Sequence, residues 1–144
     1  MADLSKQYLL FNLEETNMGF PLECIKLVLR AAELMKVPTT SGGPIGLLDM
    51  RGEMVPVYDL RTLMRMPSAT LSPDHHFIVA TPGGHKEAFL VDDIDEVVDF
   101  TESRIETPDR SNLPPFVDGM VRHDSMLILC LSEKQISERN RPSN

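Results

Sequence analysis

The chain lacks several features that mark large classes of proteins. It contains no tryptophan and only two cysteines, and aromatic residues make up 6% of its 144 positions. No apolar run approaches the roughly 20 residues that a membrane-spanning helix needs. Residues 1–13 show no basic stretch followed by an apolar segment and a cleavage site, so we expect no secretory signal. These absences predict a cytoplasmic protein.

Clustered basic residues are missing as well. Lys and Arg number 14 against 22 Asp and Glu, which gives a formal net charge of −8. Nucleic-acid binding depends on Lys and Arg gathered against phosphates, so this balance argues against a nucleic-acid partner. A length of 144 residues fits one domain, or two very small barrels that share a core.

The residues with reactive or metal-binding side chains do not form a catalytic or metal-binding motif. Cys24 and Cys130 lie inside apolar runs, which predicts two buried free thiols, although a disulfide between them stays open. His75 and His76 are adjacent and would point to opposite faces of a strand, while the other two histidines lie in predicted turns. We find no nucleophile with a base, no metal-ligand spacing and no phosphate-binding loop. The sequence therefore predicts no enzyme activity, no metal and no cofactor.

Acidic residues gather between positions 92 and 99, where they alternate with apolar ones. They lack the spacing and the closing glutamate of a calcium-binding loop. The alternation predicts a strand with one solvated face and one buried face. The acidic residues are Asp92, Asp93, Asp95, Glu96 and Asp99.

The best-specified stretch is 46–63, GLLDMRGEMVPVYDLRTL. Its two apolar runs are too short for helices, so we predict two strands joined by a tight turn at Gly52, which can supply a positive φ. Pro56 has no N–H to donate and must face an edge or a bulge. Asp59 is predicted to cap a short helix over 60–66.

The rest of the chain is typical of short strands separated by turns that contain glycine and proline. Strand 7–13 carries apolar residues on both faces. A short helix is expected within 23–30, because Ile25, Val28 and Leu29 recur at helical spacing. Ser132 should cap a final helix to about residue 138. Other strands are predicted at 18–22, 75–81, 86–91, 96–100, 117–122 and 126–131, which together indicate an all-β, barrel-like architecture.

The hairpin also carries a family resemblance. GLLDMRGEMVPVYDLR resembles the signature G-[VI]-x-N-L-R-G-x-[VI]-x-P-[VI]-[VI]-D-L-R of CheW-like domains. Looser matches at 19–25, 89–97 and 117–120 extend the resemblance over about residues 7–136. The signature residues in register are Gly46, Arg51, Gly52, Pro56, Asp59, Leu60 and Arg61.

The resemblance implies an all-β fold of two packed five-stranded SH3-like barrels with a few short helices. We expect a single CheW-like domain over 1–144, with approximate subdomains 7–68 and 74–138. An exchange of terminal strands between the subdomains stays open.

The resemblance further implies a non-catalytic chemotaxis adaptor at membrane-associated receptor arrays. Its expected partners are the regulatory domain of the histidine kinase CheA and the cytoplasmic tip of chemoreceptors. One alternative is a CheW-like regulator of a pilus- or surface-motility pathway, or a divergent accessory coupler. A small ligand-binding or enzymatic barrel is a further alternative, and it would need a convergent polar site.

Site residues follow from the same resemblance. A groove between the barrels would receive a receptor helix, whose apolar face lies in an apolar trough. The residues predicted to line this groove are Ile25, Val28 and Val98. The residues predicted to contact the kinase lie on or beside the hairpin and are Met50, Met54 and Val57. Plain core positions are the alternative for each of them.

The chain departs from the family's usual pattern at Leu27, two residues after Ile25, where relatives carry a glutamate that pairs with the arginine matched by Arg51. We predict that Asp49 gives Arg51 a carboxylate instead, since residues two apart on a strand face the same side. The alternative is that Arg51 projects into water. With Gly46 and Gly52, these two residues are predicted to have structural or interface roles.

Overall fold

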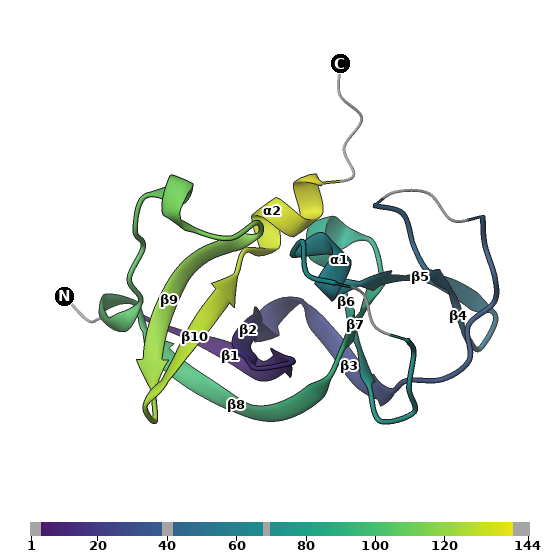
Figure 1. The fold of residues 1–144 in the computed structure, drawn as a ribbon, viewed down its shortest axis with the longest axis horizontal. Coiled ribbons are helices and arrows are strands. Elements are labelled where there is room, and N and C mark those ends of the chain that lie inside the picture. The colour runs from purple at the N-terminus through teal and green to yellow at the C-terminus, as the bar shows by residue number, and fades with distance from the viewer. Residues whose placement is uncertain (1–3, 39–41, 68–69, 140–144) are drawn as a thin grey trace, which may run out of the picture.

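The computed structural model describes residues 4–38, 42–67 and 70–139 as two five-stranded sheets that lie side by side (Figure 1). Each sheet forms one barrel-like half, which confirms the predicted all-β class. In sheet order, the first barrel contains β8 (Asp93–Thr101), β1 (Ser5–Leu13), β2 (Thr16–Pro21), β10 (Met126–Leu131) and β9 (Val117–His123). The second contains β3 (Ile25–Arg30), β6 (His76–Ala80), β7 (Glu87–Val91), β5 (Glu53–Asp59) and β4 (Gly46–Met50).

The helices are short, and all of them except the final helix lie between strands. In the described residues, the α-helix α1 (Leu60–Leu63) follows the β4–β5 hairpin, and the α-helix α2 (Glu133–Glu138) follows the β9–β10 hairpin. The 3-10 turns are η1 (Leu22–Cys24), η2 (Pro82–Gly84), η3 (Glu102–Arg104) and η4 (Arg110–Asn112).

The two barrels have the same strand plan. Each contains an antiparallel pair (β1–β2 or β6–β7), a closing hairpin (β9–β10 or β4–β5) and one parallel contact between them (β2–β10 or β5–β7). The fifth strand of each barrel, β8 or β3, comes from the chain that leaves the other barrel. The sheets therefore do not divide the chain at 68–74: β5 and β6 flank that segment and belong to one sheet. Residues 68–69 of it lie outside the described residues.

The β4–β5 hairpin confirms the tight turn predicted at Gly52. Arg51 and Gly52 have φ values of 55° and 90°, and the equivalent turn of the first barrel, Asp124-Ser125, has 48° and 67°. Gly46 is required for a different reason: a Cβ there would lie 2.7 Å from the Cβ of Leu34. Pro56 precedes the residues of β5 that pair with β7, so its missing N–H removes no bond from that ladder.

Three apolar clusters hold the molecule together. One fills each barrel, and the largest lies between the barrels. Strand β1 contributes to two of them, as predicted: Leu9 and Phe11 face the core between the barrels, while Tyr8 and Leu10 face the interior of the first barrel. The two barrels therefore share a core and fold as one unit.

The helix predicted within 23–30 is wrong. After the single turn η1, the chain enters β3, whose pairing with β6 shifts register between Ile25 and Leu27. This β-bulge places Ile25 opposite Ala80 and Val28 opposite Ile78, so residues three apart face the same side. A bulged strand thus gave the three-residue spacing that suggested a helix.

Both predicted helix caps are confirmed. The Asp59 carboxylate accepts from the Arg61 N–H at 3.0 Å, and the Ser132 hydroxyl accepts from the Gln135 N–H at 3.2 Å. Helix α1 is shorter than predicted, because it ends at Leu63 and Arg65 adopts a φ of 62°.

Candidate functional site

Ile25 and Val28 lie on an apolar face at the junction of the barrels. Both are half-buried and pack against the core between the barrels. Strand β3 is an edge strand of its sheet, as β8 is of the first sheet (Figure 1). These two edges are where the predicted groove would lie.

Val98 does not join them. It lies opposite Tyr8 in the β1–β8 pair and faces the interior of the first barrel, with 9% of its surface exposed. Its neighbour Val97 lies opposite Leu9, which faces the core between the barrels, and is 48% exposed. Successive strand residues face opposite sides, so Val97 rather than Val98 lies on the side of β8 that faces away from the interior of the first barrel. Half-buried Ile94 packs against the core between the barrels. We call Ile25, Val28, Ile94 and Val97 the inter-barrel patch.

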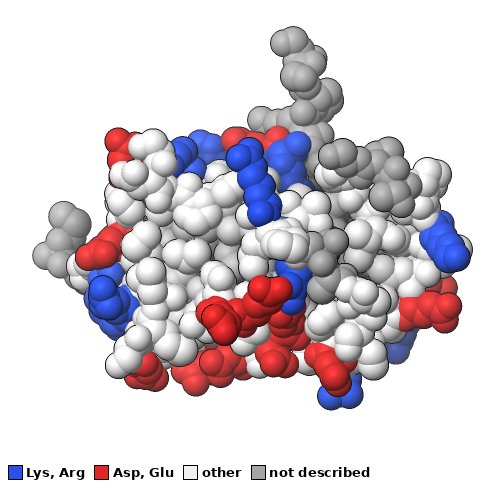
Figure 2. All heavy atoms as spheres, viewed as in Figure 1, with Lys and Arg blue, Asp and Glu red and all other residues white. Residues whose placement is uncertain are grey.

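The acidic residues of β8 flank this patch. Figure 2 shows acidic side chains along the lower rim of the molecule, where β8 runs in Figure 1. Four of the five predicted acidic residues are exposed, in agreement with a solvated face: Asp93, Asp95, Glu96 and Asp99. Asp92 is the exception and is considered below.

The predicted kinase-contact residues divide between surface and core. Met54 is 39% exposed, whereas Val57 is fully buried and Met50 packs against the interior of the second barrel. Strand alternation places Met54 on the outer face of the hairpin, with Ile45, Leu47 and Pro56. Ile45 is 40% exposed, and the other two are half-buried. We call Ile45, Leu47, Met54 and Pro56 the hairpin patch.

The predicted Asp49–Arg51 ion pair is wrong. Within the described part of the chain, no carboxylate lies within 4.0 Å of the Arg51 guanidinium, and Asp49 Oδ1 accepts from the Gly52 N–H at 2.8 Å. The same-side argument fails because Arg51 has left the strand for the turn, where its φ is 55°. Asp49 stabilises the turn, and Arg51 is exposed.

A guanidinium that sequence analysis did not single out is buried instead. The Arg61 side chain is 8% exposed and its two terminal nitrogens each lie 2.5 Å from a carboxylate oxygen, one of Glu14 and one of Asp92. The Asp92 carboxylate also accepts from the Glu14 N–H at 2.7 Å. These partners are 47 and 31 residues from Arg61 in sequence. The signature contains Arg61 but gives no sign of its partners.

The contacts of Asp92 determine its pKa. Partial burial works to raise the pKa of this carboxyl, but the hydrogen bonds from Arg61 and from the Glu14 N–H outweigh burial, so the pKa lies below its ordinary value. The hydrogen bond to Asp92 likewise raises the pKa of the Arg61 guanidinium. Both groups are therefore charged at neutral pH.

We predict that Asp92→Asn lowers the free energy of unfolding by about 1.5–3 kcal/mol at pH 5, because it removes a charged hydrogen-bond acceptor. Since the folded-state pKa of Asp92 is lowered, its contribution is complete above the unfolded-state pKa of about 3.9 and is lost as the pH falls through the folded-state pKa. Arg61, Glu14, His75 and the ring of His76 face Asp92, and the variant retains all four.

Urea unfolding of both proteins from pH 5 to pH 2.5 measures this prediction. The stability difference should shrink as the pH falls below about 4. A difference that stays constant over this range would contradict the assignment.

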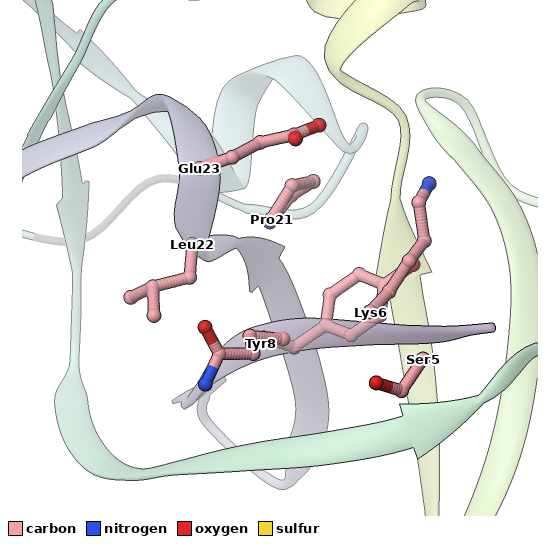
Figure 3. A pocket seen from close by; sticks show the side chains of 7 residues that line it. Ser5, Lys6, Tyr8, Pro21, Leu22 and Glu23 are labelled. Atoms are coloured by element: carbon pink, nitrogen blue, oxygen red, sulfur yellow. The ribbon is translucent and has the colours of Figure 1, made fainter.

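The two cysteines and the pocket beside β1 show no assembled catalytic group among the described residues. Cys24 and Cys130 are buried free thiols, as predicted, and burial raises the pKa of each to about 12. A pocket of about 320 Å³ beside β1 is lined by Lys6, Tyr8 and Glu23 among others, with no nucleophile–base pair among its residues (Figure 3). No group of three or more candidate metal ligands occurs in the described residues. No helix in the described ranges is long and apolar enough to span a membrane.

Comparisons with known proteins agree with this arrangement. The chain is 26% identical over 141 residues to the chemotaxis protein CheW of Thermotoga maritima, covering 96% of this chain and 93% of that protein. It is 27% identical over 89 residues to FrzA of Myxococcus xanthus, covering 62% and 56%. The crystal structure of the scaffolding protein TtCheW from Thermoanaerobacter tengcongensis superposes with a TM-score of 0.81 at 26% identity, over 90% of each chain. The model of the CheW-like domain family matches residues 7–140, and the chain therefore belongs to the CheW-like domain family.

Proposed function

We propose that this protein is a non-catalytic adaptor that couples chemoreceptors to the histidine kinase CheA. The observation that carries the proposal is the presence of two separate exposed apolar surfaces on a chain of this family. The inter-barrel patch lies on β3 and β8, and the hairpin patch lies on the outer face of β4–β5. Apolar surface left exposed on a small domain commonly marks a partner site. An adaptor needs two such sites and no reactive centre.

The inter-barrel patch is the proposed receptor site. Ile25 and Val28 on one edge strand and Ile94 and Val97 on the other present aliphatic side chains over the core between the barrels. An amphipathic helix from the tip of a receptor hairpin can lay its apolar face on such a surface. Val98 supports this surface only from the interior of the first barrel.

The hairpin patch is the proposed kinase site. Met54 is an exposed residue at the turn end of this patch, and a flexible thioether adapts well to a partner surface. Met50 and Val57 support the patch indirectly, because they pack in the interior of the second barrel on the other face of the hairpin. The proposed location is the cytoplasmic side of membrane-associated receptor arrays, with no metal or cofactor.

A second candidate function keeps the fold and changes the pathway. Leu27 is 37% exposed on β3, beside the inter-barrel patch, at a position where the family resemblance implies a glutamate. An apolar residue at that position favours a partner other than the usual chemoreceptor. The chain would then be a CheW-like regulator of a pilus- or surface-motility pathway, or an accessory coupler.

Paired substitutions test the two surfaces. Val97→Asp should weaken binding of a chemoreceptor hairpin fragment at least tenfold, because it places a charge in an apolar contact, and should leave binding of the CheA regulatory domain unchanged. Met54→Lys should do the reverse. Leu71→Lys, at another residue that is 38% exposed, is the matched control. Titration calorimetry against each partner measures the effects, and equal loss of both activities in either variant would contradict two separate sites.

A further inference from the structure

The chain crosses between the barrels twice, and each crossing leads directly into an edge strand. The first crossing is η1, between β2 and β3. The second is the single residue Asp92, between β7 and β8. Strands β3 and β8 carry the inter-barrel patch. The positions of the two crossings therefore set how the two edges of the patch lie relative to each other.

The first crossing is fixed by buried backbone. The Cys24 carbonyl accepts from the Thr81 N–H at 2.8 Å, which ties η1 to the end of β6. Cys24 is 3% exposed and belongs to the core between the barrels. This connection needs no side-chain ion pair.

The second crossing is held by side chains. The Asp92 N–H donates to the Asn12 carbonyl at 3.1 Å, and its carboxylate binds both the Glu14 N–H and the Arg61 guanidinium. Glu14 lies in the β1–β2 turn of the first barrel, whereas Arg61 lies on α1, which follows β5 of the second. The Arg61 guanidinium therefore connects the second barrel, the first barrel and the crossing between them.

We infer that Arg61 is a positioning residue for the inter-barrel patch, because through Asp92 and Glu14 it fixes β8 relative to β3. The inference rests on the proposed function, in which that patch receives a receptor helix. Arg61 does not itself belong to the patch. It acts by keeping Ile94 and Val97 on β8 at a fixed position relative to Ile25 and Val28 on β3.

A distance measurement tests this directly. Nitroxide labels on Arg51→Cys and Asp124→Cys report the separation of the two hairpin turns, one in each barrel. The native thiols are buried and should not take the label. Arg61→Met should broaden the distance distribution, whereas Arg65→Ala, which removes an exposed arginine two residues beyond the helix, should leave it unchanged. An unchanged distribution in Arg61→Met would overturn the inference.

Binding gives the functional readout. In Arg61→Met, affinity for the receptor hairpin fragment should fall about tenfold. Affinity for the CheA regulatory domain, whose proposed site lies only on the second barrel, should stay within twofold. A merely structural role would lower both affinities together, and that result would overturn the inference. If Arg61→Met does not fold, Asp92→Asn removes the same ion pair with a side chain of the same shape, and the same outcomes apply.

Failure of the proposed function is distinguishable from failure of this inference. A wild-type protein that binds no receptor hairpin fragment would refute the proposed receptor site. The label distances would still show whether Arg61 fixes the two barrels relative to each other.

Discussion

Replacing Phe89 with alanine should lower the free energy of unfolding by about 3–5 kcal/mol. Phe89 is fully buried on β7. The centre of its ring lies 5.5 Å from the ring centre of Phe20 in the first barrel and 6.1 Å from the ring centre of Tyr58. The substitution opens a cavity in the core between the barrels, which both barrels need to fold. Domains of this size are stable by only about 5–15 kcal/mol, so much of the folded state's advantage would be lost.

Chemical denaturation followed by circular dichroism measures this loss. Phe89→Leu keeps most of the volume and should cost less than about 1.5 kcal/mol. Leu127→Ala, at a residue that is 45% exposed, should change stability by no more than about 0.5 kcal/mol. A loss below about 1.5 kcal/mol for Phe89→Ala would show that the barrels hold together without this ring.

Local chemistry made much of the fold predictable. The Arg51-Gly52 turn and the caps at Asp59 and Ser132 depend on residues close in sequence, so their signals lie within a few positions of the structure that they specify. The double burial of β1 was visible because both of its faces are apolar.

Features that depend on pairing between distant strands were not predictable in the same way. The bulge in β3 exists only relative to β6, and it gave Ile25 and Val28 a helical spacing. The choice between Val97 and Val98 depends on which residue of β1 lies opposite each of them. A single sequence does not contain that register.

The buried guanidinium was missed for a related reason. Arg51 and Arg61 both belong to the family signature, and Asp49 lies near Arg51 in sequence, which suggested a local pair. The structure instead exposes Arg51 and buries Arg61 against carboxylates of distant segments. Burial, which decides how much an ion pair contributes, follows from the packing of the two barrels.

Replacing Arg139 with alanine should also cost about 3–5 kcal/mol, because it breaks a buried ion pair by removing the guanidinium that binds the Glu87 carboxylate. Arg139 follows α2, and its side chain is 7% exposed against 9% for Glu87. Its guanidinium carbon also lies 4.4 Å from the centre of the Tyr58 ring. Arg139 therefore fastens the helix that ends the first barrel onto the second barrel, as Arg61 fastens α1 onto the first.

The double variant Glu87→Gln with Arg139→Met separates the charge from the packing. Both residues become uncharged while the long side chain over Tyr58 is kept, so most of the loss should be recovered. Unfolding of the single and double variants in 0.05 M and 1 M NaCl measures this. The stability loss in Arg139→Ala should be nearly the same at both salt concentrations, because the Arg139–Glu87 pair is buried. By contrast, the contribution of the Arg61–Glu14 pair to stability should fall at 1 M NaCl, because Glu14 is 57% exposed. A double variant as unstable as Arg139→Ala would contradict this expectation, because it would show that an uncharged pair with similar packing over Tyr58 cannot replace the ion pair.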